Sequence, residues 1–83
     1  MIIVVKTPKG TLISQVLNRI HLINTVQGHG VSLADVKQWS FLGQDKVFGQ
    51  IKELIYSKEV QPDLYDIDLA TCTYIEDLLN EYG

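Results

Sequence analysis

Residues 2–5 limit the folding of this chain more than any other feature, because all four are isoleucine or valine. Branching at Cβ favours an extended backbone, and the sequence Thr7-Pro8-Lys9-Gly10 then predicts a turn that ends the extended segment. A single short strand is not stable alone. We therefore expect residues 1–10 to form a short extended N-terminal arm that pairs, packs on the rest of the chain, or joins another chain.

Beyond the arm, apolar residues recur at spacings of three and four, which is typical of amphipathic helices. The pattern predicts four helical segments, at residues 11–26, 44–57, 66–71 and 73–82. Residues 27–43 are interpreted as a long structured loop, pinned into the core by Trp39, Phe41 and Leu42. We therefore predict an all-α fold, a four-helix bundle with a long first loop, in which residues 11–83 form one helical domain. The predicted core is Val16, Leu17, Ile20, Ile23, Leu42, Val47, Ile51, Leu54, Ile67, Ile75, Leu78 and Leu79.

Length and composition set further limits. A chain of 83 residues is one domain with one small core. The single cysteine, Cys72, excludes a disulfide framework, and with only His21 and His29 beside it a closed zinc site is not expected. No run approaches the roughly 20 apolar residues of a membrane helix. We expect a small soluble domain in a reducing compartment, the cytoplasm.

The charge is uneven along the chain. Residues 59–83 carry seven Asp or Glu residues and no Lys or Arg, and the whole chain has a net charge of −3. Phosphate contacts need cations, so this distribution argues against nucleic-acid binding. It suits a protein partner with a basic patch, or else it is a solvated acidic face.

A short motif spans the end of the long loop and the start of the next helix. The sequence there is Trp39-Ser40-Phe41-Leu42-Gly43-Gln44-Asp45-Lys46-Val47. It resembles the acyl and peptidyl carrier-protein family, in which an aromatic residue and Leu-Gly-Gly/x-Asp-Ser-Leu/Ile open the second helix. Leu42, Gly43, Asp45 and Val47 match this signature. The resemblance extends over residues 11–82 and implies the four-helix carrier fold.

One departure from the family is decisive for chemistry. The serine that carries 4'-phosphopantetheine in carriers is replaced by Lys46. A lysine amine, with an ordinary pKa of about 10.4, does not inherit the role of that hydroxyl. We therefore expect no cofactor. Ser32 is an alternative attachment site, but Val31 stands where the family has Asp, and Ser40 also lacks a preceding Asp.

The resemblance also implies a partner surface, since the second helix of carriers docks on partner enzymes. Asp45 and Lys46 occupy the positions of the cofactor site. The implied partner-binding residues are Gln44, Asp45, Lys46, Phe48, Gln50 and Glu53. The function implied is a non-enzymatic docking module, without its attachment serine, in a fatty-acid, polyketide or nonribosomal peptide system. Its partner would be a biosynthetic enzyme with a basic patch.

No arrangement of residues in the sequence predicts catalysis. Gly28-His29-Gly30 lacks the Lys-Ser/Thr of a phosphate-binding loop, and Cys72 has acidic or neutral neighbours that do not favour a thiolate. His21 and His29 have no catalytic partner at a suitable spacing, so surface or capping roles are expected for both.

Two other functions fit parts of the sequence. A helix-turn-helix DNA-binding regulator would use residues 32–39 as its first helix and 44–56 as its recognition helix, although few cations are available for phosphate contacts. A small inhibitor or interaction protein would instead pair residues 2–5 with the edge of a partner's sheet.

Overall fold

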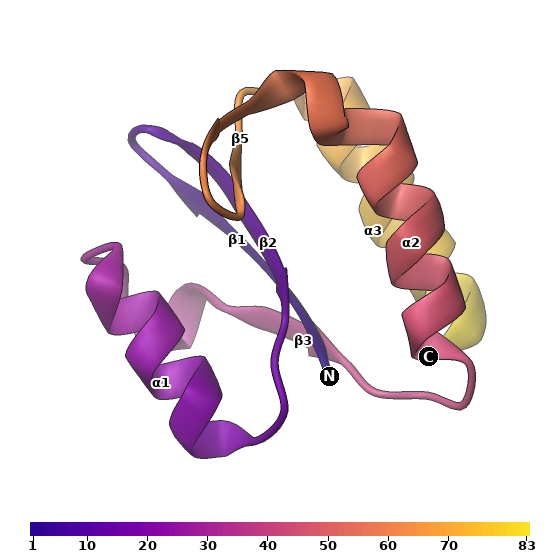
Figure 1. Ribbon diagram of the computed structural model, residues 1–83, viewed down its shortest axis with the longest axis horizontal. Helices are drawn as coiled ribbons and strands as arrows, with labels where there is room; N and C mark the ends of the chain where they lie inside the picture. The colour runs from indigo at the N-terminus through magenta and orange to yellow at the C-terminus, as the bar shows by residue number, and fades with distance from the viewer.

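The computed structural model describes all 83 residues and shows an antiparallel five-stranded sheet with helices on both faces (Figure 1). The strand order across the sheet is β3-β1-β2-β5-β4. The elements in chain order are β1 (Ile2–Thr7), β2 (Gly10–Gln15), α1 (Arg19–Gly28), η1 (Leu33–Asp35), β3 (Lys37–Trp39), α2 (Gln44–Ile55), η2 (Tyr56–Lys58), β4 (Glu59–Gln61), β5 (Leu64–Tyr65) and α3 (Leu69–Tyr82). This is an α+β fold, so the prediction of an all-α four-helix bundle is wrong.

The N-terminal segment is an inner strand of the sheet and not a free arm. β1 pairs with β2 in a register that runs from Ile2 opposite Gln15 to Thr7 opposite Gly10. On its other side β1 pairs with β3, where Ile2 lies opposite Trp39. The strand that pairs with the Ile-Val segment is therefore β2, the next segment in the chain.

The turn between β1 and β2 is closed by local hydrogen bonds. The backbone N–H of Lys9 donates to Thr7 Oγ1 at 3.1 Å, and the Thr7 hydroxyl donates to the Gly10 carbonyl at 3.0 Å. Gly10 has a φ of +144°, and a Cβ atom there would lie 2.7 Å from the carbonyl oxygen of Tyr65. Only glycine adopts this conformation without strain and leaves room for β5 to approach.

The predicted helix over 11–26 is wrong in its first half. Residues 10–15 form β2, and α1 begins only at Arg19, after Asn18 caps it by accepting a hydrogen bond from the His21 backbone N–H at 2.9 Å. A strand buried on both faces has apolar neighbours in succession, and such a run also satisfies helical spacing. Leu17 and Ile20, which the helical pattern placed in the core, are 88% and 71% exposed.

Side chains of β1 alternate between two apolar layers, because successive residues of a strand point to opposite faces. Ile2 and Val4 belong to the layer beneath α2 and α3, whereas Ile3 packs against α1. Val5 continues the second layer with Leu12 and Leu64. Figure 1 shows the sheet between α1 on one side and the pair α2 and α3 on the other. The chain therefore builds two thin cores that share one sheet.

The C-terminal half agrees better with the sequence pattern. The predicted helix at 44–57 is present as α2, continued by η2. The segments predicted as a short helix at 66–71 and a last helix at 73–82 are one helix, α3, whose N-cap is Asp68 and not Thr73. The predicted loop 27–43 contains η1 and the edge strand β3.

The predicted core residues divide into three groups. Five are buried, namely Val16, Val47, Ile51, Ile75 and Leu79. Three are half-buried, namely Ile23, Ile67 and Leu78. Four are exposed and were placed wrongly, namely Leu17, Ile20, Leu42 and Leu54. Trp39 and Phe41 do pack against the α2–α3 layer, as the loop interpretation expected.

The structure gives little of the element that each alternative function was predicted to use. Residues 32–39 form a 3-10 turn and a strand, so the first helix of a helix-turn-helix is absent. β1 is paired on both sides over residues 2–4, so this part of the strand has no free edge for a partner's sheet, whereas Val5 is paired with β2 only.

We expect Ile51→Ala to lower the free energy of unfolding by about 2–5 kcal/mol, because a side chain that is 1% exposed leaves a cavity when truncated. Leu54→Ala on the same helix is the matched control, since Leu54 is 52% exposed and surface changes cost roughly 0.5 kcal/mol. Denaturant unfolding monitored by circular dichroism measures both. Equal effects of the two substitutions would contradict the placement of α2 on the sheet.

Candidate functional site

The structure scatters the residues that were predicted to bind a partner on α2. Lys46, Gln50 and Glu53 are exposed, whereas Gln44 and Phe48 are half-buried. Phe48 packs against the α2–α3 core layer, and Asp45 accepts a hydrogen bond from the Gln15 side-chain amide on β2. The predicted surface is therefore split between solvent and the interior of the fold.

The start of α2, where carriers attach phosphopantetheine, is open to solvent. Lys46 lies exposed in the first turn of the helix, where its ammonium makes no ion pair. Gly43 precedes the helix with a φ of +84° in open space, and Leu42 is fully exposed. The Leu-Gly-x-Asp motif thus begins a helix, as the resemblance implied, but forms no cavity.

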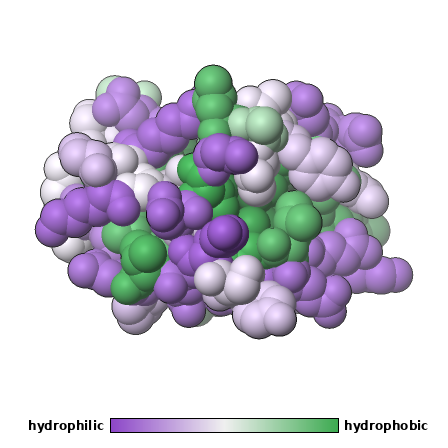
Figure 2. Space-filling view, turned by 90° about the horizontal axis from the view of Figure 1, so that it is seen from above, coloured by the Kyte–Doolittle hydropathy of each residue, from purple (hydrophilic) through white to green (hydrophobic).

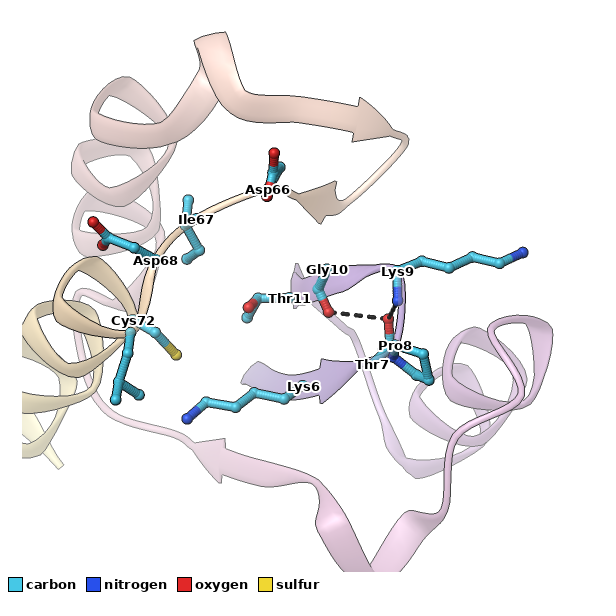
Figure 3. Close-up of a pocket in the computed structure, with 11 residues that line it drawn as sticks. Lys6, Thr7, Pro8, Lys9, Gly10, Thr11, Asp66, Ile67, Asp68 and Cys72 are labelled. Carbon is cyan, nitrogen blue, oxygen red and sulfur yellow. Dashed lines mark hydrogen bonds between the residues drawn. The ribbon is translucent and has the colours of Figure 1, made fainter.

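A polar pocket of about 390 Å³ lies between the β1–β2 turn and the start of α3 (Figure 3). The side chains of Lys6, Thr11 and Cys72 point toward one another inside it, while Lys9 and Asp66 point away from its centre. The pocket lining combines lysines of the β1–β2 hairpin with aspartates of the 66–68 segment. The pocket therefore favours neither an anionic nor a cationic ligand.

The thiol in this pocket is shielded and not activated. Cys72 is 2% exposed, and its thiol donates to Glu76 Oε2 over 3.7 Å. Burial raises the pKa of Cys72, the charge of Glu76 raises it further, and Lys6 opposes the effect. Glu76 is itself bound to Lys37 at 2.6 Å. Burial and the neighbouring carboxylate favour the protonated thiol, and this carboxylate is itself paired with Lys37, so the setting does not favour a nucleophilic thiolate.

Both histidines lie at the ends of α1. Nδ1 of His21 accepts a hydrogen bond from the backbone N–H of Leu17 at 3.1 Å, and His29 is the C-cap residue of the helix. Nowhere in the chain do three His, Cys, Asp or Glu side chains meet in a group that could hold a metal ion. No helix combines the length and the apolar character needed to cross a bilayer.

A second hollow follows the outer side of α2 and α3. Its apolar part, of about 350 Å³, is lined by Leu54, Ala70, Thr71 and Tyr74. An adjoining part of about 360 Å³ shares Leu54 and Thr71 and extends to a rim formed by Lys58, Asp66 and Asp68. We call the two together the α2–α3 groove.

The apolar side chains of the α2–α3 groove are unusually open to solvent. Leu54 is 52% exposed and Tyr74 58%. Figure 2 looks onto the end of the molecule where α3 begins and shows hydrophobic areas set among hydrophilic side chains. Exposed apolar residues that line one hollow mark an interaction site more often than isolated ones do.

Two aspartates lie at one end of the groove. Asp68 accepts a hydrogen bond from the Thr71 backbone N–H at 2.8 Å, and this bonding to Thr71 lowers the pKa of the Asp68 carboxyl. Asp66 is exposed and makes no ion pair. Lys58 is the one cation that lines the groove. The rim therefore keeps a net negative charge at neutral pH.

Sequence reasoning missed this groove because it assigned Leu54 to the core and gave Tyr74 no role. The sequence of α3 does indicate a second apolar surface. Cys72, Ile75 and Leu79 form its buried side, and Ala70 and Tyr74 follow an i, i+4 spacing on the opposite side. One apolar side of such a helix packs on the sheet, and the other is available to contact another element or a partner.

We expect the Cys72 thiol of the native protein to react with a disulfide reagent on the order of 100-fold more slowly than after denaturation, because reaction requires local opening. Its pH–rate midpoint should lie above that of an exposed cysteine, since burial and Glu76 raise its pKa. The matched control is Cys72→Ser combined with Thr73→Cys, which moves the thiol to an exposed neighbour. Equal native rates for the two proteins would contradict the shielded thiol.

Comparison with known proteins adds no family to this description. No protein-family model, curated protein or solved structure matches the chain. The resemblance to carrier proteins thus rests on the motif at residues 39–47, without a match that identifies the carrier family.

Proposed function

We propose that this protein is a non-enzymatic docking module that binds a protein partner through the α2–α3 groove. The observation that carries this proposal is the exposure of Leu54 and Tyr74 on opposite walls of one hollow. A few side chains near the centre of an interface, with tyrosine often among them, supply most of its binding energy.

The groove has the arrangement of a partner site in a small protein. Its centre is apolar, at Leu54, Ala70 and Tyr74, and its rim is charged, at Lys58, Asp66 and Asp68. An apolar centre with a polar rim is the usual anatomy of a protein interface. The floor includes Ile55, which is fully buried, so the sheet supports the site from below.

The exposed apolar side chains near the start of α1 are less suited to docking. Leu17 and Ile20 lie at the start of α1, next to Arg19. The hollow nearest to them, lined by Arg19, Leu22, Leu33, Val36 and Gln38, has a volume of only about 50 Å³. Scattered apolar residues of this kind are normal on protein surfaces.

Part of the sequence-based prediction is kept in this proposal and part is not. We keep docking to a protein with a basic patch, and we keep Glu53, which neighbours Leu54 on α2. A role in fatty-acid, polyketide or nonribosomal peptide biosynthesis depended on the four-helix carrier fold, so the sheet leaves it without structural support. We also propose a cytoplasmic location, because the single cysteine is a free thiol, as is usual in reducing compartments.

A photo-crosslinking amino acid placed at Tyr74 tests the proposed site in cells that express the protein. We expect a defined protein adduct from position 74 and none from Ile20, an exposed apolar residue in the opposite layer. The adduct should disappear when Leu54→Asp is added, because a charge in the apolar centre is costly to bury. Adducts of equal yield from positions 74 and 20, or no adduct from position 74, would overturn the proposal.

A further inference from the structure

We propose that the occupant of the α2–α3 groove is a basic amphipathic helix, about three to four turns long, contributed by another protein. This inference rests on the proposed docking function and names the chemistry of the partner. It follows from the shape of the groove, the order of side chains along α3, and the charge around the apolar centre.

The shape favours a helix. The groove runs between two helices that lie side by side, and a third helix packs naturally into such a space because its side-chain ridges fit the groove. The outward side of α3 repeats Ala70, Tyr74, Asp77 and Glu81 at helical spacing. At a rise of 1.5 Å per residue this stretch is about 17 Å long, which corresponds to three to four turns of a partner helix.

The order of side chains places apolar contacts in the middle and charges at both ends. Asp66 and Asp68 lie before the apolar pair Ala70 and Tyr74, and Asp77 follows it. The small side chain of Ala70 lets a partner backbone approach α3 closely. A ligand that fits this order has apolar residues on one face and cations toward each end.

The negative charge of the groove rim favours a basic partner over a second copy of this chain. Asp66 and Asp68 line the groove against one cation, Lys58, and Asp77 and Glu81 continue along α3 without a nearby Lys or Arg in the sequence. The only ion pair of the molecule joins Lys37 to Glu76, so the acids of the groove are free to meet cations. Two copies facing each other across this groove would bring like charges together, which disfavours self-association.

A labelled synthetic peptide of about 15 residues tests the inference, with leucines along one helical face and lysines flanking them toward both ends. We expect it to bind the intact protein in fluorescence anisotropy, with an affinity that falls as salt is added. The same peptide with every Lys replaced by Glu should not bind. A peptide of the same composition with a scrambled pattern should bind at least about tenfold more weakly, because it cannot form the apolar face.

Protein variants locate the site. Leu54→Ala and Tyr74→Ala should each weaken binding roughly tenfold, as expected for side chains at the centre of an interface. Asp66→Asn should weaken it a few-fold, whereas Ile20→Ala and Asp35→Asn are matched exposed controls that should leave it unchanged.

Lys58→Gln should strengthen binding by removing the one opposing cation, a gain that loss of folding cannot produce. Thermal melting of every variant verifies that it is folded.

Equal binding of the Lys and Glu peptides, or unchanged binding after both Leu54→Ala and Tyr74→Ala, would overturn this inference. Its failure is distinct from failure of the docking function. A crosslinked partner at position 74 whose contacting segment is acidic or non-helical would leave the docking site in place and refute the basic helix. Absence of any adduct at position 74 would refute both.

Discussion

The pairing of β1 with β2 is the interaction on which the rest of this structure depends. Four successive β-branched residues, Ile2–Val5, are buried because one pair faces each side of the sheet. A two-sided strand cannot be stable at a surface, so helices must cover both faces, and the chain supplies α1 for one and α2 with α3 for the other (Figure 1). Gly10 makes this possible, because the close approach of Tyr65 leaves no room for a side chain at the turn.

This division of the helices also creates the candidate site. α2 and α3 each bury one side on the sheet, through Ile51 and Ile55 in one helix and Ile75 and Leu79 in the other. No other element of the fold covers their outer sides, where Leu54 and Tyr74 stay exposed around a groove. The acidic residues that keep this surface solvated also determine which partners can approach it. The proposed function therefore depends on the same packing of α2 and α3 on the sheet that builds the fold.

The sequence predicts some of these features for clear physical reasons. α2 was placed correctly because its apolar stripe is regular, and the turn at 7–10 was recognised from Pro8 and Gly10. The segment 11–16 was assigned to a helix because Leu12, Ile13 and Val16 satisfy both a helical stripe and a strand that is buried on two sides. Only the pairing with β1, a tertiary contact, decides between them. The α3 wall of the groove could be predicted from the spacing of Ala70 and Tyr74, but the α2 wall could not, because knowing that Leu54 is uncovered requires knowing where every other element lies.

Backbone proton contacts in solution by nuclear magnetic resonance test the central hairpin most directly. The account predicts cross-strand contacts between Val4 and Ile13 and between Lys6 and Thr11, together with slow amide exchange along β1. Contacts between residues three apart throughout 11–16, with no cross-strand contacts to residues 2–7, would identify a helix there. That result would contradict the two-sided sheet, and with it the arrangement of helices that forms the α2–α3 groove.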